Sequence, residues 1–135
     1  MLFRSGETLN PTEIVLGMLP DVIVGYTIRE LVLPVEYGRS AEIAVSEYDM
    51  LRPAAVIMLG QAGGRSAISP ETTVRNLMDC KEPDNAGRIA DHLRIVENGP
   101  DTMSSTLPVD RIMAALEERG IPCEISGDAG AFVCN

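Results

Sequence analysis

Residues 54–59, AAVIML, form a continuous apolar run of strand length, and this run constrains the fold more than any other segment. A strand that is covered on both faces, as in a parallel sheet between helices, has such an unbroken pattern. The loop that follows at residues 60–66, GQAGGRS, contains three glycines. In open α/β sheets, ligand crevices lie at the carboxyl ends of the strands. The strand and its loop therefore predict a mostly parallel sheet with a ligand-binding edge after residue 59.

The other segments alternate between helical and extended patterns. A capping residue, a proline and an acid predict a helix that begins at Asn10-Pro11. Periodic apolar residues predict two more helices, over residues 37–51 and 106–120, which Pro53 and Gly120 end. Polar residues 81–103 predict an irregular excursion, with a small hairpin as one option. Alternating strands and helices indicate the α/β class. The predicted extended segments are residues 22–24, 28–33, 72–78 and 121–126, with a bend at Gly25 between the first two.

Charge and cysteine usage restrict the partners and the location. The formal net charge is -9, and the 11 basic residues form no cluster of the kind that binds a phosphate backbone. No apolar run approaches the ~20 residues of a membrane-spanning helix. We therefore expect neither a nucleic-acid partner nor a membrane. The three cysteines are widely spaced and odd in number, which favours a reducing, cytoplasmic location over a disulfide framework.

Cys134 is the main candidate catalytic residue. It follows the glycine-punctuated turn SGDAG at residues 126–130, which itself follows an extended segment. A thiol on a strand–turn–helix mount meets the positive end of the helix dipole, which favours the nucleophilic thiolate. The alternative is an unreactive cysteine that packs as a small hydrophobic residue.

Three other residues are weaker candidates. The loop at residues 60–66 matches neither GxGxxG nor a P-loop, so Gln61 is either a ligand contact or part of a plain turn. Glu71 is either a site carboxylate or a solvated one. His92 lies among charged residues and is expected at the surface. With one histidine and no CxxC pair, we expect no zinc site.

Taken together, the segments resemble the pyroglutamyl peptidase I family, also called pyrrolidone-carboxylate peptidases, which are cysteine peptidases. The matching segments span nearly the whole chain in family order. They are GETLNP at 6–11, LPV at 33–35, GQAGGRS at 60–66 with Pro70-Glu71, PDN at 83–85, GP at 99–100, TLP at 106–108, GIP at 120–122 and AGAFVCN at 129–135.

The resemblance implies a function and a role for individual residues. The family removes an N-terminal pyroglutamate (5-oxoproline) from peptides without a metal or organic cofactor. By position, Cys134 would be the nucleophile and Glu71 the carboxylate that orients the catalytic histidine. Gln61 would line the lactam pocket, with Phe132 and Val133 as apolar walls. The substrates would be peptides that begin with pyroglutamate.

Three departures from the family pattern matter. The family histidine lies in a later GFIHxP-like motif that these 135 residues do not contain, and His92 does not occupy its position. Phe3 matches a pocket phenylalanine only if one residue is inserted after it. Lys81 stands where the family has an arginine, and the two cations do not form equivalent hydrogen bonds.

These departures lead to an expectation about the domain. Residues 1–135 would form a single, partial domain of a three-layer α/β/α sandwich, without the first strand and the C-terminal strand and helices. Its apolar run at residues 54–59 would then be poorly covered, and the chain alone would show no turnover. Three alternatives stay open: a non-catalytic relative that binds a lactam or a peptide end, a thiol-redox enzyme, and a structural protein. The sequence leaves the oligomeric state open, with a homo-oligomer as one option.

Overall fold

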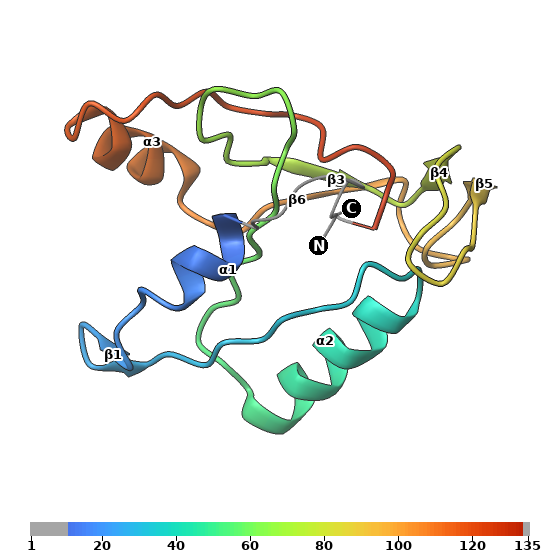
Figure 1. The fold of residues 1–135 in the computed structure, drawn as a ribbon, viewed down its shortest axis with the longest axis horizontal. Coiled ribbons are helices and arrows are strands. Elements are labelled where there is room, and N and C mark those ends of the chain that lie inside the picture. Colours follow the sequence, from blue (N-terminus) through green and yellow to red (C-terminus); the bar gives the residue numbers. More distant parts are fainter. Residues whose placement is uncertain (1–10, 134–135) are drawn as a thin grey trace. The chain divides into compact units, whose positions relative to one another are not determined.

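A computed structural model describes residues 11–133 of the chain, which divides into two compact units with the boundary between Gln61 and Ala62. The described residues form three helices and several short strands, joined by long irregular segments (Figure 1). Within the described residues, no helix is both long and apolar enough to span a bilayer. The secondary structure is of the mixed α and β kind that the sequence predicts.

The first unit begins with helix α1, Pro11–Leu16, which starts at the predicted proline. Strands β1, Val22–Ile23, and β2, Tyr26–Thr27, then pair antiparallel as a tight hairpin. Val24 and Gly25 form its turn, and both have positive φ angles, of 50° and 82°. Two positive φ angles match the hairpin turn that follows the twist of the strands. The predicted bend at Gly25 is confirmed.

Helix α2, Arg39–Leu51, begins two residues after the predicted start and ends at the predicted residue. Ser40 stabilises the entry, because its hydroxyl donates to the backbone oxygens of Pro34 and Glu36. Arg52 ends the helix in a left-handed conformation, with φ of 45°, immediately before Pro53. A residue before proline is disfavoured in the helical region, which explains the end of α2.

The prediction of a buried strand at residues 54–59 is wrong for this structure. The segment has no strand assignment, and its side chains are exposed, with Met58 77% exposed. Residues 28–33, also predicted to be extended strand, form none. A strand needs a neighbouring strand that accepts and donates its backbone hydrogen bonds. No strand pair among residues 11–133 includes either segment, so neither has such a neighbour. The apolar run is poorly covered, as the sequence led us to expect.

The second unit contains two antiparallel strand pairs. Strand β3, Thr73–Arg75, pairs with β6, Thr102–Ser104. Strand β4, Met78–Cys80, pairs with β5, Ala90–Leu93. The predicted extended segment at residues 72–78 is thus confirmed in large part. The polar excursion after it contains β5 and most of β6, which pair with β4 and β3 respectively. Parallel pairing between described residues is limited to two isolated bridges, Ile68 with Cys123 and Glu71 with Ser126.

Helix α3, Val109–Glu117, confirms the third predicted helix. Its apolar face, which includes Ile112, Met113 and Leu116, is half-buried. The helix ends before Gly120, whose φ is +64°, and the Ile121 amide donates to the Leu116 carbonyl at 3.0 Å. A glycine in the left-handed conformation is a common helix terminator.

Fully buried apolar side chains are few in the described residues. Val35 and Tyr37 are buried in the first unit, and Ala90 is buried in the second. Most other large apolar side chains are half-buried or exposed. Hydrogen bonds rather than a large apolar core therefore define much of the described structure, and this includes the region around Glu71.

Candidate active site

The backbone around Glu71 is held by Ser126, a residue on the segment that leads toward Cys134. The amide of Ser126 donates to the carbonyl of Pro70 at 3.1 Å. The amide of Thr72 donates to the carbonyl of Ser126 at 2.8 Å, and the Thr72 hydroxyl donates to the same oxygen at 3.1 Å. Glu71 therefore lies opposite Ser126 in a parallel bridge. The acid and the segment before the candidate nucleophile are adjacent within the second unit.

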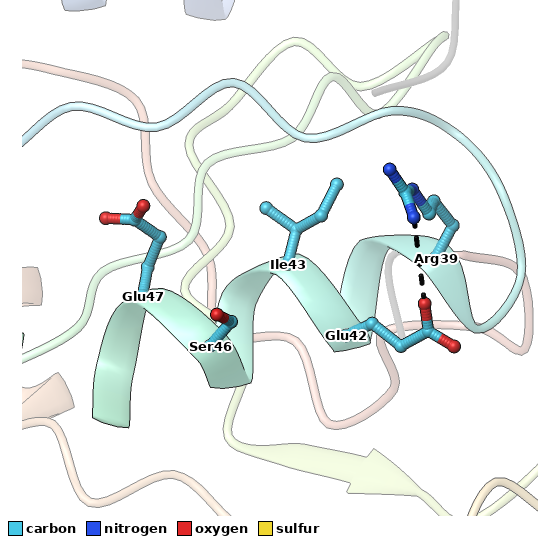
Figure 2. Close-up of a pocket in the computed structure, with 5 residues that line it drawn as sticks. All are labelled: Arg39, Glu42, Ile43, Ser46 and Glu47. Carbon is cyan, nitrogen blue, oxygen red and sulfur yellow. Dashed lines mark ion pairs between the residues drawn. The ribbon is translucent and has the colours of Figure 1, made fainter. Parts of the chain in front are cut away.

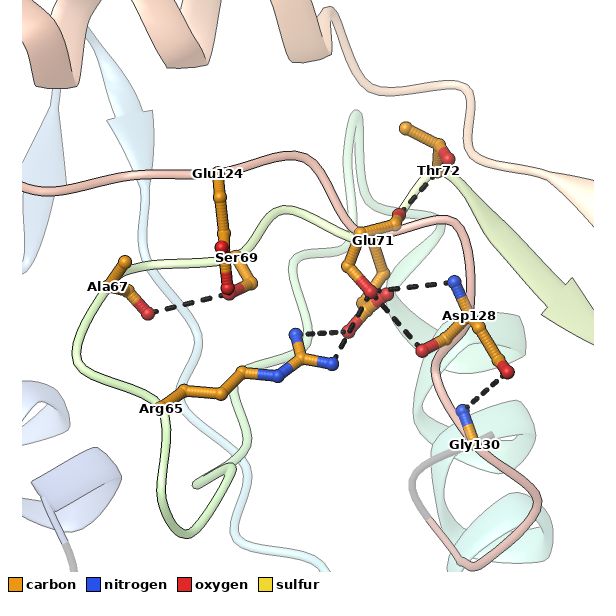
Figure 3. Close-up of polar contacts among 9 residues, drawn as sticks. Arg65, Ala67, Ser69, Glu71, Thr72, Glu124, Asp128 and Gly130 are labelled. Carbon is orange, nitrogen blue, oxygen red and sulfur yellow. Dashed lines mark hydrogen bonds and ion pairs between the residues drawn. The ribbon is translucent and has the colours of Figure 1, made fainter.

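One carboxylate oxygen of Glu71 has a hydrogen-bond partner, and the other has none among the described residues. Arg65 Nη1 donates to Glu71 Oε1 at 3.3 Å, and Arg65 Nη2 donates to the Ser126 hydroxyl at 3.5 Å. Figure 3 shows the guanidinium of Arg65 directed toward Glu71 across the turn that joins them. Glu71 Oε2 is buried and has no hydrogen-bond partner among the described residues.

The turn before Cys134 is held by Asp128. The Asp128 carboxylate accepts hydrogen bonds from Arg75 Nε at 3.0 Å and from Arg75 Nη2. It also accepts the Gly130 amide at 2.9 Å. The Arg75 hydrogen bond, followed by the Gly130 amide, lowers the pKa of Asp128 below its ordinary value of 3.8. A side chain thus ties this turn to strand β3.

Gly130 gives the turn its conformation, with a φ of +82°. Such an angle is strained for residues with a Cβ atom. One residue later, the Ala131 carbonyl accepts the Asp79 amide at 2.8 Å, which anchors the turn to strand β4. Phe132 and Val133 follow and are half-buried. The segment that leads to the candidate nucleophile therefore has defined attachments on both sides of Gly130.

The structure brings together only part of the predicted site. Glu71, Phe132 and Val133 lie in the second unit, whereas Gln61 is half-buried and ends the first unit. Cys134 and Phe3 lie outside the described residues. Their assignments stay predictions.

His92 is a surface residue, as predicted, and is 76% exposed. Its Nδ1 lies 2.8 Å from Asp91 Oδ1, and its Nε2 lies 3.5 Å from Asp79 Oδ2. The Asp91 hydrogen bond is the main cause that raises the pKa of His92 above 6.5, and the Asp79 charge adds to it. These three residues, beside a cavity of about 370 Å³, are the one described group with the spacing of metal ligands. Both imidazole nitrogens already face carboxylates, which form ion pairs with the ring when it is protonated.

A second hollow, of about 260 Å³, lies on helix α2. Figure 2 shows its five lining side chains, all of which come from this one helix. Arg39 and Glu42 form an ion pair at its rim, with Nη1 and Oε2 4.0 Å apart. The hollow is therefore a depression on a helix surface, and it contains none of the predicted site residues.

Comparison with known proteins identifies the family. A family model described as pyroglutamyl peptidase matches residues 3–135. The chain belongs to the pyroglutamyl peptidase family. The family membership predicted from the motifs is confirmed.

Individual pyroglutamyl peptidase relatives agree with this membership. A pyrrolidone-carboxylate peptidase from Chromobacterium violaceum is 41% identical over 131 residues, which cover 96% of this chain and 62% of the relative. The crystal structure of the pyrrolidone carboxyl peptidase from Pyrococcus furiosus matches with a TM-score of 0.91 and 39% identity, over 96% of this chain and 63% of that one. The Thermus thermophilus structure matches with a TM-score of 0.90 and 35% identity, over 96% and 67%. The chain thus spans about 62% of the length of the Chromobacterium relative.

Three residues of this candidate site were not predicted from the sequence. Arg65 was part of a matched motif but had no role assigned, although it lies six residues before Glu71 and pairs with it. Arg75 and Asp128 are 53 residues apart in the sequence, and no local pattern links them. A cation in the glycine loop so near a candidate acid was the one signal that the sequence offered.

Proposed function

We propose that this chain is part of a cysteine peptidase that removes N-terminal pyroglutamate from peptides. The observation that carries the proposal is the parallel bridge between Glu71 and Ser126, which joins the candidate acid to the segment that leads to Cys134. Family membership and relatives that are named pyrrolidone-carboxylate peptidases support it.

In the proposed reaction, the Cys134 thiolate attacks the carbonyl carbon of the pyroglutamyl–peptide bond. A catalytic histidine, from the GFIHxP-like family motif that these 135 residues do not contain, takes the thiol proton and gives it to the departing amine. This step leaves a pyroglutamyl thioester and releases the shortened peptide. Water then hydrolyses the thioester, which releases pyroglutamate and restores the thiol. Glu71 orients the imidazole and stabilises its charged form, as the acid of a catalytic triad does.

The pocket residues serve an uncharged lactam. Phe132, Val133 and Phe3 would supply apolar walls to the ring, and the Gln61 amide would hydrogen-bond its polar edge. No metal and no organic cofactor takes part in this scheme. The cytoplasm keeps thiols reduced, which suits a thiol nucleophile, so we place the protein there.

For the fold, we propose one domain of the three-layer α/β/α kind with a mostly parallel central sheet. The structural similarity to the Pyrococcus furiosus pyrrolidone carboxyl peptidase, with a TM-score of 0.91, supports an α/β fold of this kind. The two compact units would then be parts of one domain. Protection of the amides of residues 54–59 from hydrogen exchange, in a protein of the relatives' full length, would test the burial of this run.

The test of function begins with the gene beyond codon 135 and its product. Reading the frame should show a GFIHxP-like segment. The purified product should release a chromophore from a pyroglutamyl amide, and thiol alkylation should abolish the release. Cys134→Ser should be inactive, whereas Cys80→Ser, which alters a free cysteine on strand β4, should keep activity.

Two results would contradict the proposal. Hydrolysis that persists in Cys134→Ser would refute the assignment of the nucleophile. A product that ends without the histidine motif and shows no turnover would instead favour the alternative, a non-catalytic relative that binds a lactam or a peptide end. Binding of free 5-oxoproline, measured by calorimetry, would separate that alternative from a purely structural protein.

A further inference from the structure

The two carboxylate oxygens of Glu71 lie in different surroundings. Oε1 accepts a hydrogen bond from Arg65, whereas Oε2 is buried and has no partner among residues 11–133. Buried carboxylate oxygens are nearly always hydrogen-bonded, because an unpaired one loses its hydration without compensation. Oε2 is therefore the atom of Glu71 that requires a donor.

Arg65 determines which oxygen is left for that donor. The Ser126 amide donates to the Pro70 carbonyl, and the Thr72 amide donates to the Ser126 carbonyl. These bonds fix the backbone of Glu71, but they do not restrain the rotation of its carboxylate. The guanidinium of Arg65 does so, since one amino group contacts Glu71 Oε1 and the other contacts the Ser126 hydroxyl. A planar fork that is anchored at two points holds its partner in a defined orientation, which a lysine ammonium cannot reproduce.

We propose that Arg65 is a positioning residue, which holds Glu71 through Oε1 so that Oε2 faces the N–H of the catalytic imidazole. The inference rests on the proposed function and adds to it a separate partner for each carboxylate oxygen, Arg65 for Oε1 and the imidazole for Oε2. Arg65 touches neither the substrate nor the thiol in this scheme. It acts through Glu71 alone.

The test measures kcat and KM of the full-length gene product on a pyroglutamyl amide. Arg65→Met should lower kcat on the order of 10- to 100-fold, because a misaligned catalytic group loses effective molarity. KM should change little, since Arg65 makes no contact with the substrate. Arg65→Lys keeps the positive charge but loses the two-point contact of the guanidinium. Its kcat should lie between those of the wild type and Arg65→Met.

Arg94→Met is the matched control. Arg94 is 42% exposed and pairs with Asp101 at 2.9 Å, while Arg65 is 36% exposed and pairs with Glu71 at 3.3 Å. Both variants remove one half-exposed ion pair from the same unit, but only Arg65 contacts the candidate acid. Arg94→Met should keep the wild-type kcat. An equal loss in both variants would show that the effect is structural and would overturn the proposal.

A double-mutant cycle with Glu71→Gln decides whether Arg65 acts through the acid. In the Glu71→Gln background, Arg65→Met should lower kcat by less than twofold, because no charged carboxylate remains to be oriented. A full, multiplicative loss in that background would refute the inference. If Arg65→Met fails to fold, Arg65→Lys takes its place in the cycle with the same two outcomes. An inactive wild type would refute the proposed function and this inference with it, whereas an active wild type matched by Arg65→Met would refute this inference alone.

Discussion

At Gly130, the backbone conformation alone determines how much an alanine substitution should lower the free energy of unfolding. Its φ is +82°, and a Cβ atom placed there would meet nothing within 4 Å. Substitution by alanine therefore creates no clash, and its whole cost is the left-handed conformation, about 1–2 kcal/mol. We expect Gly130→Ala to lower the free energy of unfolding by that amount.

Gly127→Ala is the control within the same turn. A Cβ atom at Gly127 would also meet nothing within 4 Å, but Gly127 is not among the glycines with positive φ. Alanine at a compatible position reduces the entropy of the unfolded chain, so this variant should be unchanged or more stable by up to ~1 kcal/mol. The two substitutions add the same methyl group to the same turn and should have opposite effects.

Urea unfolding followed by circular dichroism measures the difference. With a denaturant slope of about 1–3 kcal/mol per molar, Gly130→Ala should lower the midpoint by roughly 0.3–2 M, whereas Gly127→Ala should not lower it. Equal midpoints for the two variants would refute the reasoning, because they would show that the turn does not require the left-handed conformation at Gly130. A lower midpoint for Gly127→Ala alone would refute it as well.

Three other predictions concern single side chains. Because the folded pKa of Asp128 is lowered, its carboxylate stabilises the fold above its unfolded pKa, and this stabilisation is lost as the pH falls through the folded value. Asp128→Asn should therefore be less stable than the wild type near pH 7 and should converge with it as the pH falls from 3.8 through the lower folded pKa of Asp128, and a constant difference in urea midpoint would contradict this. The pKa of His92 is raised, so an NMR titration of this single histidine should give a value above 6.5, and Asp91→Asn should lower it; an unchanged value in the variant would show that Asp91 is not the cause. Val24→Asn should raise the thermal midpoint, because asparagine adopts positive φ at a hairpin turn more readily than a β-branched residue, and a lower midpoint would argue against the turn geometry.

The sequence predicted the features whose causes are local. A proline at a first helical position, a proline after a last turn and a glycine at a helix end located the three helices to within a few residues. The bend at Gly25 was predicted for the same reason, since glycine tolerates positive φ. Such signals act within a few residues of one another, and their effect does not depend on the rest of the fold.

Features that depend on distant partners were predicted less well. Residues 54–59 have the composition of a buried strand, but a strand also needs neighbours, and the described ladders supply none. The ion pair between Arg75 and Asp128 joins residues far apart in the sequence, and charge alone could not single it out among the other charged residues. The roles of Cys134 and Phe3 stay predictions, because both residues lie outside the described part of the chain.

The candidate site combines both kinds of determinant, and this has a consequence for mutagenesis. Backbone hydrogen bonds with Ser126 bring the Glu71 segment beside the segment before Cys134, and none of these bonds involves a charged side chain. Arg65 and Asp128 then orient what the backbone has placed, one at the carboxylate and the other at the turn. Substitution of Arg65 should therefore change the chemistry more than the fold. Substitution of Gly130, which alters the backbone itself, should do the reverse.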